Sequence, residues 1–392
     1  MQTIANVYWA LQQYSQAIET FQQALPLLKD LRNLFAEGDP NTVVMDTSIG
    51  QIHFSIGQIY STLGQYLKSQ EYLSQGLELL QKALVDTRAN NNRELESTES
   101  IILQSLLGSY EVLGQTYTAQ GQYELAIGSL QKALELAKQL GDQEREKGLF
   151  ESLVRNYALQ GLAYQAQRDY EGALKSLQQS LKISRENSLQ DLEAMLLLYI
   201  GGNYASRQHF AQALNYQHQA QAIIDQSNDH SLQIQLFFDR GSVYKNLSRY
   251  PEALESCQQA YSLLQATGDS LGTAPILLAI GGIYASQKQY DQALNSYQQV
   301  QEILQNNPFA PFENGINADN VEEFCTVAQH VGAVGGTFSL ADSCTSAYAL
   351  GVEALKQQQF QIQNDFTPFQ RSPELSRIVK FSWCKAFRAI KF

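Results

Sequence analysis

The stretch GGIYASQKQY, residues 281–290, recurs with variations along most of this 392-residue chain. In each copy a small residue is followed three positions later by Tyr, nine later by a second aromatic residue and twelve later by Ala or Ser. Self-similarity of this kind is typical of repeat architectures, in which each unit packs on its neighbours. The seven copies have their small residue at Ala5, Gly57, Gly114, Gly161, Gly201, Gly241 and Gly281.

The spacing within one copy predicts two helices. Leu277, Ile280 and Tyr284 lie four before, one before and three after the glycine, and these offsets share one face of an α-helix. The apolar pattern begins again at the second aromatic residue, Tyr290, and predicts a second helix there. A glycine in the first helix opposite Ala293 in the second allows the two backbones to approach closely. We therefore predict an all-α fold built from helix pairs.

This pattern resembles the tetratricopeptide repeat, a helix–turn–helix module, over about residues 1–305. The usual period of that family is about 34 residues, whereas the last four glycines here are 40 apart, as in arrays of the kinesin-light-chain type and in bacterial arrays that precede CHAT protease domains. The first two intervals, 52 and 57 residues, predict longer helices joined by loops within 31–49 and 84–100. The resemblance implies a right-handed α-solenoid with a long concave surface.

The second helix of a pair is expected to end at Gly or Asn followed by Asp. Gly and Asn suit the left-handed residue just past a helix end, and Asp suits the start of the next helix. This pattern occurs at Gly141-Asp142, Asn228-Asp229 and Gly268-Asp269.

The resemblance also implies that the first helix of each pair lines the concave side, one, four and five residues after the small residue. These positions carry small, neutral, hydrogen-bonding side chains, which suit an extended segment of a protein or peptide partner. An alternative interpretation is that the small residues only tighten the superhelix. Lys245 and Asn246 alone resemble the clamp with which chaperone-binding members hold a terminal carboxylate, so that ligand is not predicted. The candidate groove residues are Gln58, Ser61, Thr62, Gln115, Thr118, Gln165, Ser206, Ser242, Lys245, Asn246 and Ser286.

No motif predicts catalysis, a metal or a cofactor. In HVGAVGGTFSLADSC, residues 330–344, His330 and Cys344 resemble the His/Cys dyad of CHAT proteases, but the surrounding segment is far too short for such a domain, so no catalytic residue is carried over. The glycines there fit no phosphate-binding motif. His53 falls on a packing position of the repeat and is predicted to be a core histidine. We therefore predict no enzyme.

Charge, hydropathy and cysteine content limit the classes of partner and the cellular compartments that fit this sequence. The net charge of −12 argues against nucleic acid as the main partner. The sequence has no signal-peptide pattern and no apolar run of membrane-spanning length. Four scattered cysteines suggest small buried thiols in a reducing compartment. These features predict a cytoplasmic protein, and the resemblance to bacterial arrays favours a bacterial one.

The two ends of the array depart from the pattern. Residues 306–319 are predicted to be a linker, and 320–392 a helical capping and tail region that ends in a basic amphipathic helix, 371–392, of net charge +5. That helix could be a terminal packing helix, dock on the acidic array, contact an anionic membrane surface, or result from an altered reading frame. At the other end, Ala5 is already at the small position and no polar cap precedes it. Either the natural chain starts further upstream, or this face pairs with another molecule.

The sequence thus favours a non-enzymatic scaffold that binds a protein or peptide in the groove of the array. One alternative is a sensing or regulatory subunit for a separate or missing effector, such as a CHAT-type protease. Another is a small enzyme within residues 306–392.

Overall fold

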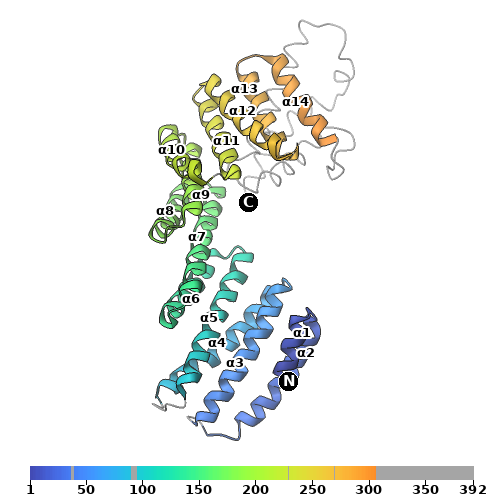
Figure 1. Cartoon of the computed structure of the whole chain (residues 1–392), viewed down its shortest axis with the longest axis vertical. Coiled ribbons are helices and arrows are strands. Elements are labelled where there is room, and N and C mark those ends of the chain that lie inside the picture. Colours follow the sequence, from blue (N-terminus) through green and yellow to red (C-terminus); the bar gives the residue numbers. More distant parts are fainter. Residues whose placement is uncertain (37–38, 90–94, 228, 269, 306–392) are drawn as a thin grey trace. The chain divides into compact units, whose positions relative to one another are not determined.

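The computed structural model describes residues 1–305 apart from 37–38, 90–94, 228 and 269 (Figure 1). These residues form fourteen α-helices, α1 to α14, and no strand. The chain divides into two compact units, and the boundary lies between Leu196 and Leu197, inside the helix Gln190–Ser206. The all-α repeat fold predicted from the sequence is confirmed. The linker 306–319 and the tail 320–392 lie outside the described residues, and their boundaries stay predictions.

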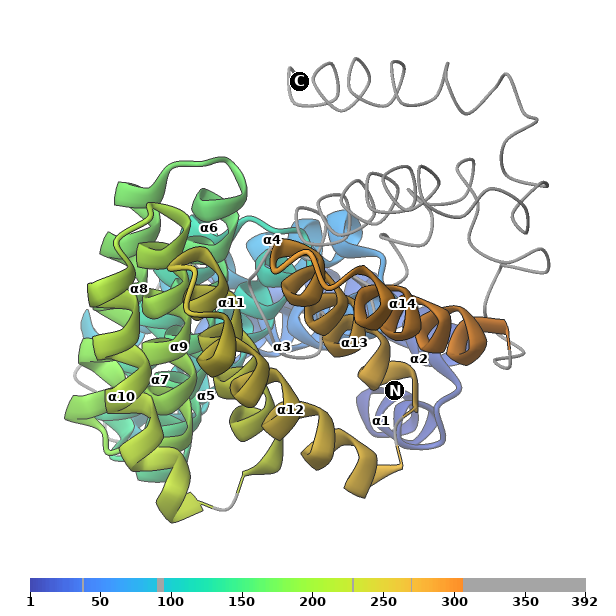
Figure 2. The same cartoon turned by 90° about the horizontal axis from the view of Figure 1, so that it is seen from above.

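Unit 1 contains four helix pairs and the start of α9. Its helices are α1 (Gln2–Ala10), α2 (Tyr14–Arg32), α3 (Pro40–Thr62), α4 (Tyr66–Ala89), α5 (Glu96–Ala119), α6 (Tyr123–Leu140), α7 (Gln143–Ala166) and α8 (Tyr170–Glu186). In unit 2, α11 packs on α12 and α13 packs on α14, as Figure 2 shows from above. Its helices are the end of α9 (Gln190–Ser206), α10 (Phe210–Ser227), α11 (His230–Asn246), α12 (Tyr250–Thr267), α13 (Ser270–Ser286) and α14 (Tyr290–Gln305).

All seven pairs have the same turn. Each odd-numbered helix ends five residues after the small residue of its repeat, and each even-numbered helix begins at the second aromatic residue. The predicted restart of the helical pattern is therefore confirmed in every copy. The first residues of the even helices are Tyr14, Tyr66, Tyr123, Tyr170, Phe210, Tyr250 and Tyr290.

A left-handed residue closes each of these turns. It lies seven positions after the small residue, and its φ is between 59° and 71°. The next residue donates its backbone N–H to the carbonyl oxygen of the repeat tyrosine over 2.8–2.9 Å, which is the long bond of a Schellman motif. The left-handed residues are Gln12, Gly64, Gly121, Arg168, Gln208, Ser248 and Lys288. Because five of the seven are not glycine, this position was not predicted from the sequence.

The long repeat intervals are taken up by long helices, as predicted. Helices α3, α4, α5 and α7 have 23, 24, 24 and 24 residues, whereas α9, α11 and α13 have 17 each. Asp39 caps α3 by accepting a hydrogen bond from the Asn41 backbone N–H over 2.8 Å, and Pro40 is the first helical residue.

The predicted ends of the even helices are also confirmed where the structure describes them. Gly141 and Gly268 have φ of 68° and 76°. Asp142 accepts a hydrogen bond from the Arg145 backbone N–H over 3.1 Å, and Asp229 accepts bonds from two backbone N–H groups at the start of α11. Asn228 and Asp269 lie outside the described residues.

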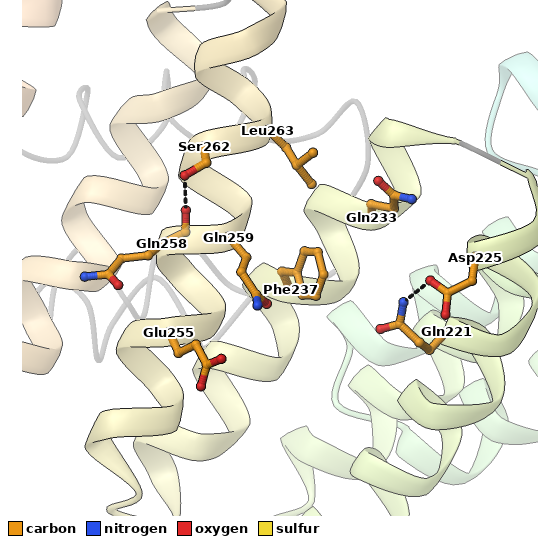
Figure 3. A pocket seen from close by; sticks show the side chains of 9 residues that line it. All are labelled: Gln221, Asp225, Gln233, Phe237, Glu255, Gln258, Gln259, Ser262 and Leu263. Atoms are coloured by element: carbon orange, nitrogen blue, oxygen red, sulfur yellow. Dashed lines mark hydrogen bonds between the residues drawn. The ribbon is translucent and has the colours of Figure 1, made fainter.

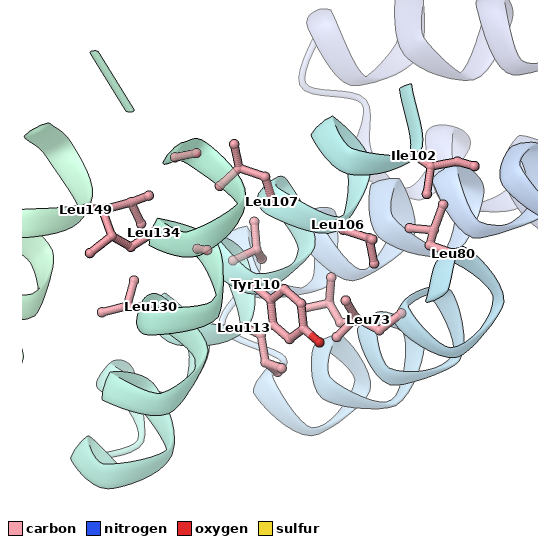
Figure 4. Close-up of a cluster of buried hydrophobic side chains, with 14 of the residues drawn as sticks. Leu73, Leu80, Ile102, Leu106, Leu107, Tyr110, Leu113, Leu130, Leu134 and Leu149 are labelled. Carbon is pink, nitrogen blue, oxygen red and sulfur yellow. The ribbon is translucent and has the colours of Figure 1, made fainter. Parts of the chain in front are cut away.

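The helices of a pair approach closely at the repeat glycine. A Cβ on Gly57 or Gly114 would lie 2.7 or 2.8 Å from the Cγ atom of Leu73 or Leu130, so only glycine fits without a shift of the partner. In unit 1 this packing merges into a cluster across α3–α7, in which Leu73 and Leu80 of α4 lie beside residues of α5 such as Tyr110 (Figure 4). The close approach predicted from the glycine and alanine positions is confirmed.

Candidate functional site

The predicted groove residues lie in the last turns of odd-numbered helices. None of the eleven is fully buried; Thr62, Gln115 and Asn246 are exposed and the others are half-buried. Those of α3, α5 and α7 belong to unit 1, and those of α9, α11 and α13 to unit 2. Whether they bind a ligand stays a prediction.

Two of these side chains in unit 1 connect neighbouring repeats. Ser61 Oγ of α3 lies 3.1 Å from Thr116 Oγ1 of α5. Thr118 Oγ1 of α5 lies 2.7 Å from Asn156 Oδ1 of α7. Both contacts are of the kind expected if polar residues tighten the array, so Ser61 and Thr118 have less capacity left for a ligand.

Other candidates bond within their own helix. Ser242 and Ser286 donate to the carbonyl oxygens of Phe238 and Gly282 over 3.2 and 2.8 Å, and Thr62 donates to that of Gln58 over 3.1 Å. A hydroxyl that gives its proton to the preceding turn still has acceptor lone pairs. These positions can therefore accept hydrogen bonds from an incoming backbone or side chain.

Lys245 is the cationic member of the candidate set. It is half-buried on α11, and burial lowers the pKa of its ammonium group, while the nearby Cys257 acts in the opposite direction. Lys245 makes no ion pair with any described residue. Cys257 itself is buried and its pKa is raised to about 12 by that burial, so it is an inert packing thiol of the type predicted.

The partners of these polar side chains were not predicted from the sequence. Thr116 and Asn156 were not among the candidates, yet they complete the contacts between α3, α5 and α7. Gln51 of α3 and Ser105 of α5 make a similar bond over 3.2 Å. One feature of the sequence could have indicated Thr116. It is a polar residue two positions after the small residue, where the second copy has Ile59.

A separate cavity of about 470 Å³ opens between α10, α11 and α12 (Figure 3). Phe237 of α11 lies between the side chains from α10 and those from α12, and the charged residues that line the cavity are Asp225 and Glu255. Most of the lining comes from even-numbered helices, so this cavity is not the predicted groove. Its residues are Gln221, Asp225, Gln233, Phe237, Glu255, Gln258, Gln259, Ser262 and Leu263.

His53, at a packing position of the repeat, lies on α3. His53 is buried against Tyr72, with ring centroids 5.7 Å apart, and burial lowers its pKa to about 4, so the predicted core histidine is confirmed. No cluster of three metal-binding side chains occurs within the described part of the chain. None of the helices described is long and apolar enough to cross a bilayer. His330 and Cys344 lie outside the described residues.

Comparison with known families agrees with this geometry. Tetratricopeptide-repeat profiles match residues 229–306, residues 109–144, and residues 1–27, 50–79 and 154–187. The fifth copy, around Gly201, lies outside these ranges, but α9 and α10 have the same left-handed turn at Gln208. The chain belongs to the tetratricopeptide-repeat family. No curated protein matches its sequence significantly.

Solved structures with a similar fold share little sequence. BtubC from P. vanneervenii is 18% identical, with a TM-score of 0.42 over 59% of this chain and 90% of that one. A Rap protein solved in complex with competence and sporulation factor is 15% identical, with a TM-score of 0.39 over 92% and 100%. Kinesin-light-chain repeats from Podosopora anserina are 16% identical, with a TM-score of 0.31 over 58% and 95%. These likenesses concern the fold alone.

Proposed function

We propose that this chain is a non-enzymatic scaffold that binds an extended protein or peptide segment along its odd-numbered helices. The supporting observation is the repeated polar row at the ends of these helices, which includes half-buried and exposed amides and hydroxyls in both units. In unit 1, Gln58 and Gln115 carry amides that can both donate and accept. In unit 2, Lys245 and Asn246 add donors beside the acceptor of Ser242.

An extended segment suits this row because its backbone carries one donor and one acceptor at nearly every residue. Within each unit, the amides and hydroxyls, joined in unit 2 by the Lys245 ammonium group, can satisfy such a backbone without a fixed side-chain sequence. Ser61 and Thr118 contribute less, since their hydroxyls already bond between repeats. We therefore expect Gln58, Gln115 and Lys245 to contribute most to the binding of the segment.

The test begins with peptides selected from a random display library on the intact chain. A selected peptide is then titrated by calorimetry against Gln58→Ala, Gln115→Ala and Lys245→Met. We expect each change to weaken binding roughly 3- to 10-fold, as for the loss of one hydrogen bond or one charge-assisted bond. The matched controls are Gln221→Ala and Gln258→Ala in the cavity between even-numbered helices, which should change the affinity less than about twofold.

A selected peptide whose binding depends on the cavity residues and ignores the odd-helix residues would contradict this proposal. A chain that ends at Gln305 should still bind the peptide. Loss of binding on that truncation would place the interaction in residues 306–392 and support the alternative that the tail is the functional part.

We also propose that the protein is bacterial and cytoplasmic and that it acts without a cofactor, a metal or a nucleic-acid partner. The hypothesis of a sensing subunit for a separate effector, such as a CHAT-type protease, requires the same groove as its ligand site. The neighbouring coding sequences distinguish an independent scaffold from a sensing subunit, because an effector would be encoded beside this chain or in continuation of it.

A further inference from the structure

The cavity between α10, α11 and α12 lies where α11 differs from the odd-numbered helices of unit 1. Four residues before the repeat glycine, α5 and α7 carry Tyr110 and Tyr157. Their hydroxyls accept hydrogen bonds from Gln81 of α4 over 2.7 Å and from Gln131 of α6 over 3.3 Å. At this position α11 carries Phe237, which has no hydroxyl to bond with α10. Its ring instead lines the cavity of about 470 Å³.

Both walls of this cavity carry a carboxylate. Asp225 comes from α10 and Glu255 from α12, and Phe237 of α11 lies between the two walls (Figure 3). Among the described residues that line the cavity, none is a lysine, an arginine or a histidine. Asp225 and Glu255 are exposed, and neither forms an ion pair with a described residue. The cavity therefore presents two unpaired negative charges with an aromatic ring between them.

Glutamine side chains add hydrogen-bond acceptors to both walls. Gln221 of α10 donates its amide to Asp225 over 2.5 Å, which leaves the Gln221 carbonyl oxygen as an acceptor. Gln259 of α12 points toward Phe237 (Figure 3). The positive charge of Arg240 on α11 interacts with that of Asp225, but Arg240 does not line the cavity and forms no ion pair with this carboxylate. Both walls thus offer negative charge and acceptors to a cationic ligand.

This arrangement suits an aliphatic chain with an ammonium group at each end. An ammonium group donates up to about three hydrogen bonds, and its strongest acceptors are carboxylates. Methylene groups can pack on Phe237 and Leu263, and the ring of Phe237 also attracts a cation. A metal ion suits the site less well, because no cluster of three metal-binding side chains occurs among the residues described. The cavity volume of about 470 Å³ is within the range of small-molecule sites.

We propose that this cavity binds a linear polyamine, with one ammonium group at Asp225, another at Glu255 and the methylene chain across Phe237. This inference does not depend on the groove, since no residue that lines the cavity belongs to the candidate groove set. The net charge of −12 favours the approach of a cation to the protein.

The test is calorimetric titration of the intact chain with spermidine and with a series of linear diamines of increasing length. The best diamine should bind at a single site, and the monoamine of the same chain length should bind roughly 10-fold more weakly, because it can contact only one carboxylate. Asp225→Asn and Glu255→Gln should each weaken the binding of this diamine about 10-fold. Phe237→Leu should weaken it about 3-fold through the loss of the ring.

The matched control is Glu71→Gln on α4. Glu71 is exposed and lies 14 residues after its repeat glycine, as Glu255 does, so this variant removes the same charge outside the cavity. It should change the affinity for the diamine less than about twofold, as should Gln115→Ala in the groove. Circular dichroism should show the same helix content in all variants.

Three results would overturn the proposal. The first is the absence of saturable binding of spermidine and of every diamine. The second is an equal loss of affinity in Glu71→Gln and Glu255→Gln, which would mean that the amines respond only to net charge. The third is tighter binding of a capped peptide with two lysines than of any free amine, which would identify a basic protein segment as the occupant.

Discussion

Two buried carboxylates, Asp46 and Asp239, differ in whether a cationic side chain lies beside them. Asp46 of α3 is bound by the Arg32 guanidinium, with Nε 3.0 Å from Oδ1, and the Lys82 ammonium lies 3.9 Å from Oδ2. Asp239 of α11 is 3% exposed and makes no ion pair with any described residue. Burial raises the pKa of Asp239 to about 7, and the influence of the Gln235 side chain, which lowers this pKa, only partly offsets it.

The raised pKa of Asp239 predicts that this group destabilises the protein as the pH rises. In the unfolded chain the carboxyl ionises near pH 3.9, whereas the folded protein keeps it protonated up to about pH 7. Its contribution to stability is therefore present below about pH 4 and is lost as the pH rises through 7. Asp239→Asn should raise the free energy of unfolding by about 1–3 kcal/mol at pH 8 and leave it nearly unchanged at pH 4.5.

Urea denaturation of both proteins at the two pH values measures this difference. The matched control is Asp225→Asn on α10, an exposed carboxyl for which we expect little change at either pH. An Asp239→Asn effect of equal size at pH 4.5 and pH 8 would contradict this prediction. It would show that the difference in the free energy of unfolding between aspartate and asparagine arises from packing and not from ionisation.

At the scale of the helix, the same residue type has two different roles. Gly114 of α5 faces Leu130, and a Cβ added there would lie 2.8 Å from Leu130 Cγ. Gly128 of α6 also lies inside a helix, but an added Cβ would meet no atom within 4 Å. The close approach of the paired helix requires glycine at position 114, whereas the space around position 128 can accept a larger side chain.

This contrast predicts opposite effects of the same substitution. Gly114→Ala should lower the free energy of unfolding by about 1–3 kcal/mol through overpacking. Gly128→Ala should raise it by about 0.5–1 kcal/mol, because alanine loses less backbone entropy in a helix. Chemical denaturation compares the two variants with the wild type. A stabilising Gly114→Ala would mean that Leu130 moves aside easily and that the close approach contributes little.

At the scale of the whole molecule, stability in a repeat array comes from the contacts of each unit with its neighbours. The first pair, α1 and α2, packs on α3 and leaves its other side exposed. Trp9 of α1 packs against this cluster, and Trp383 is the other tryptophan of the chain. Fluorescence of a Trp383→Phe variant therefore reports on the first repeat alone.

We expect the first repeat to unfold before the rest of the array. In urea, the Trp9 fluorescence transition of Trp383→Phe should have a lower midpoint than the loss of helix seen by far-ultraviolet circular dichroism. Coincident transitions would show that the array unfolds as a single cooperative unit.

Much of the fold was predictable because its signals are periodic and local. The spacing from a small residue to Tyr and to a second aromatic residue was enough to predict seven helix pairs and the first residue of each even-numbered helix. The burial of His53 followed from its position in the same pattern. The two long intervals between the first three repeats predicted longer helices, and α3, α4 and α5 have 23 or 24 residues each.

The candidate site was predictable only in part, because spacing places a side chain on a helix face without identifying what it touches. The same rule selected Ser61, Thr118 and Lys245, but the tertiary structure bonds the first two to Thr116 and Asn156 and leaves Lys245 without an ion pair among the described residues. The left-handed conformation at Arg168 and Lys288 could not be predicted from the residue type, because neither residue is glycine. The backbone hydrogen bond of the Schellman motif stabilises it at both positions. By itself, the sequence determined the helices and their pairing through local periodicity. Only the tertiary structure decided which polar groups bond across repeats, because those contacts depend on neighbours distant in the chain.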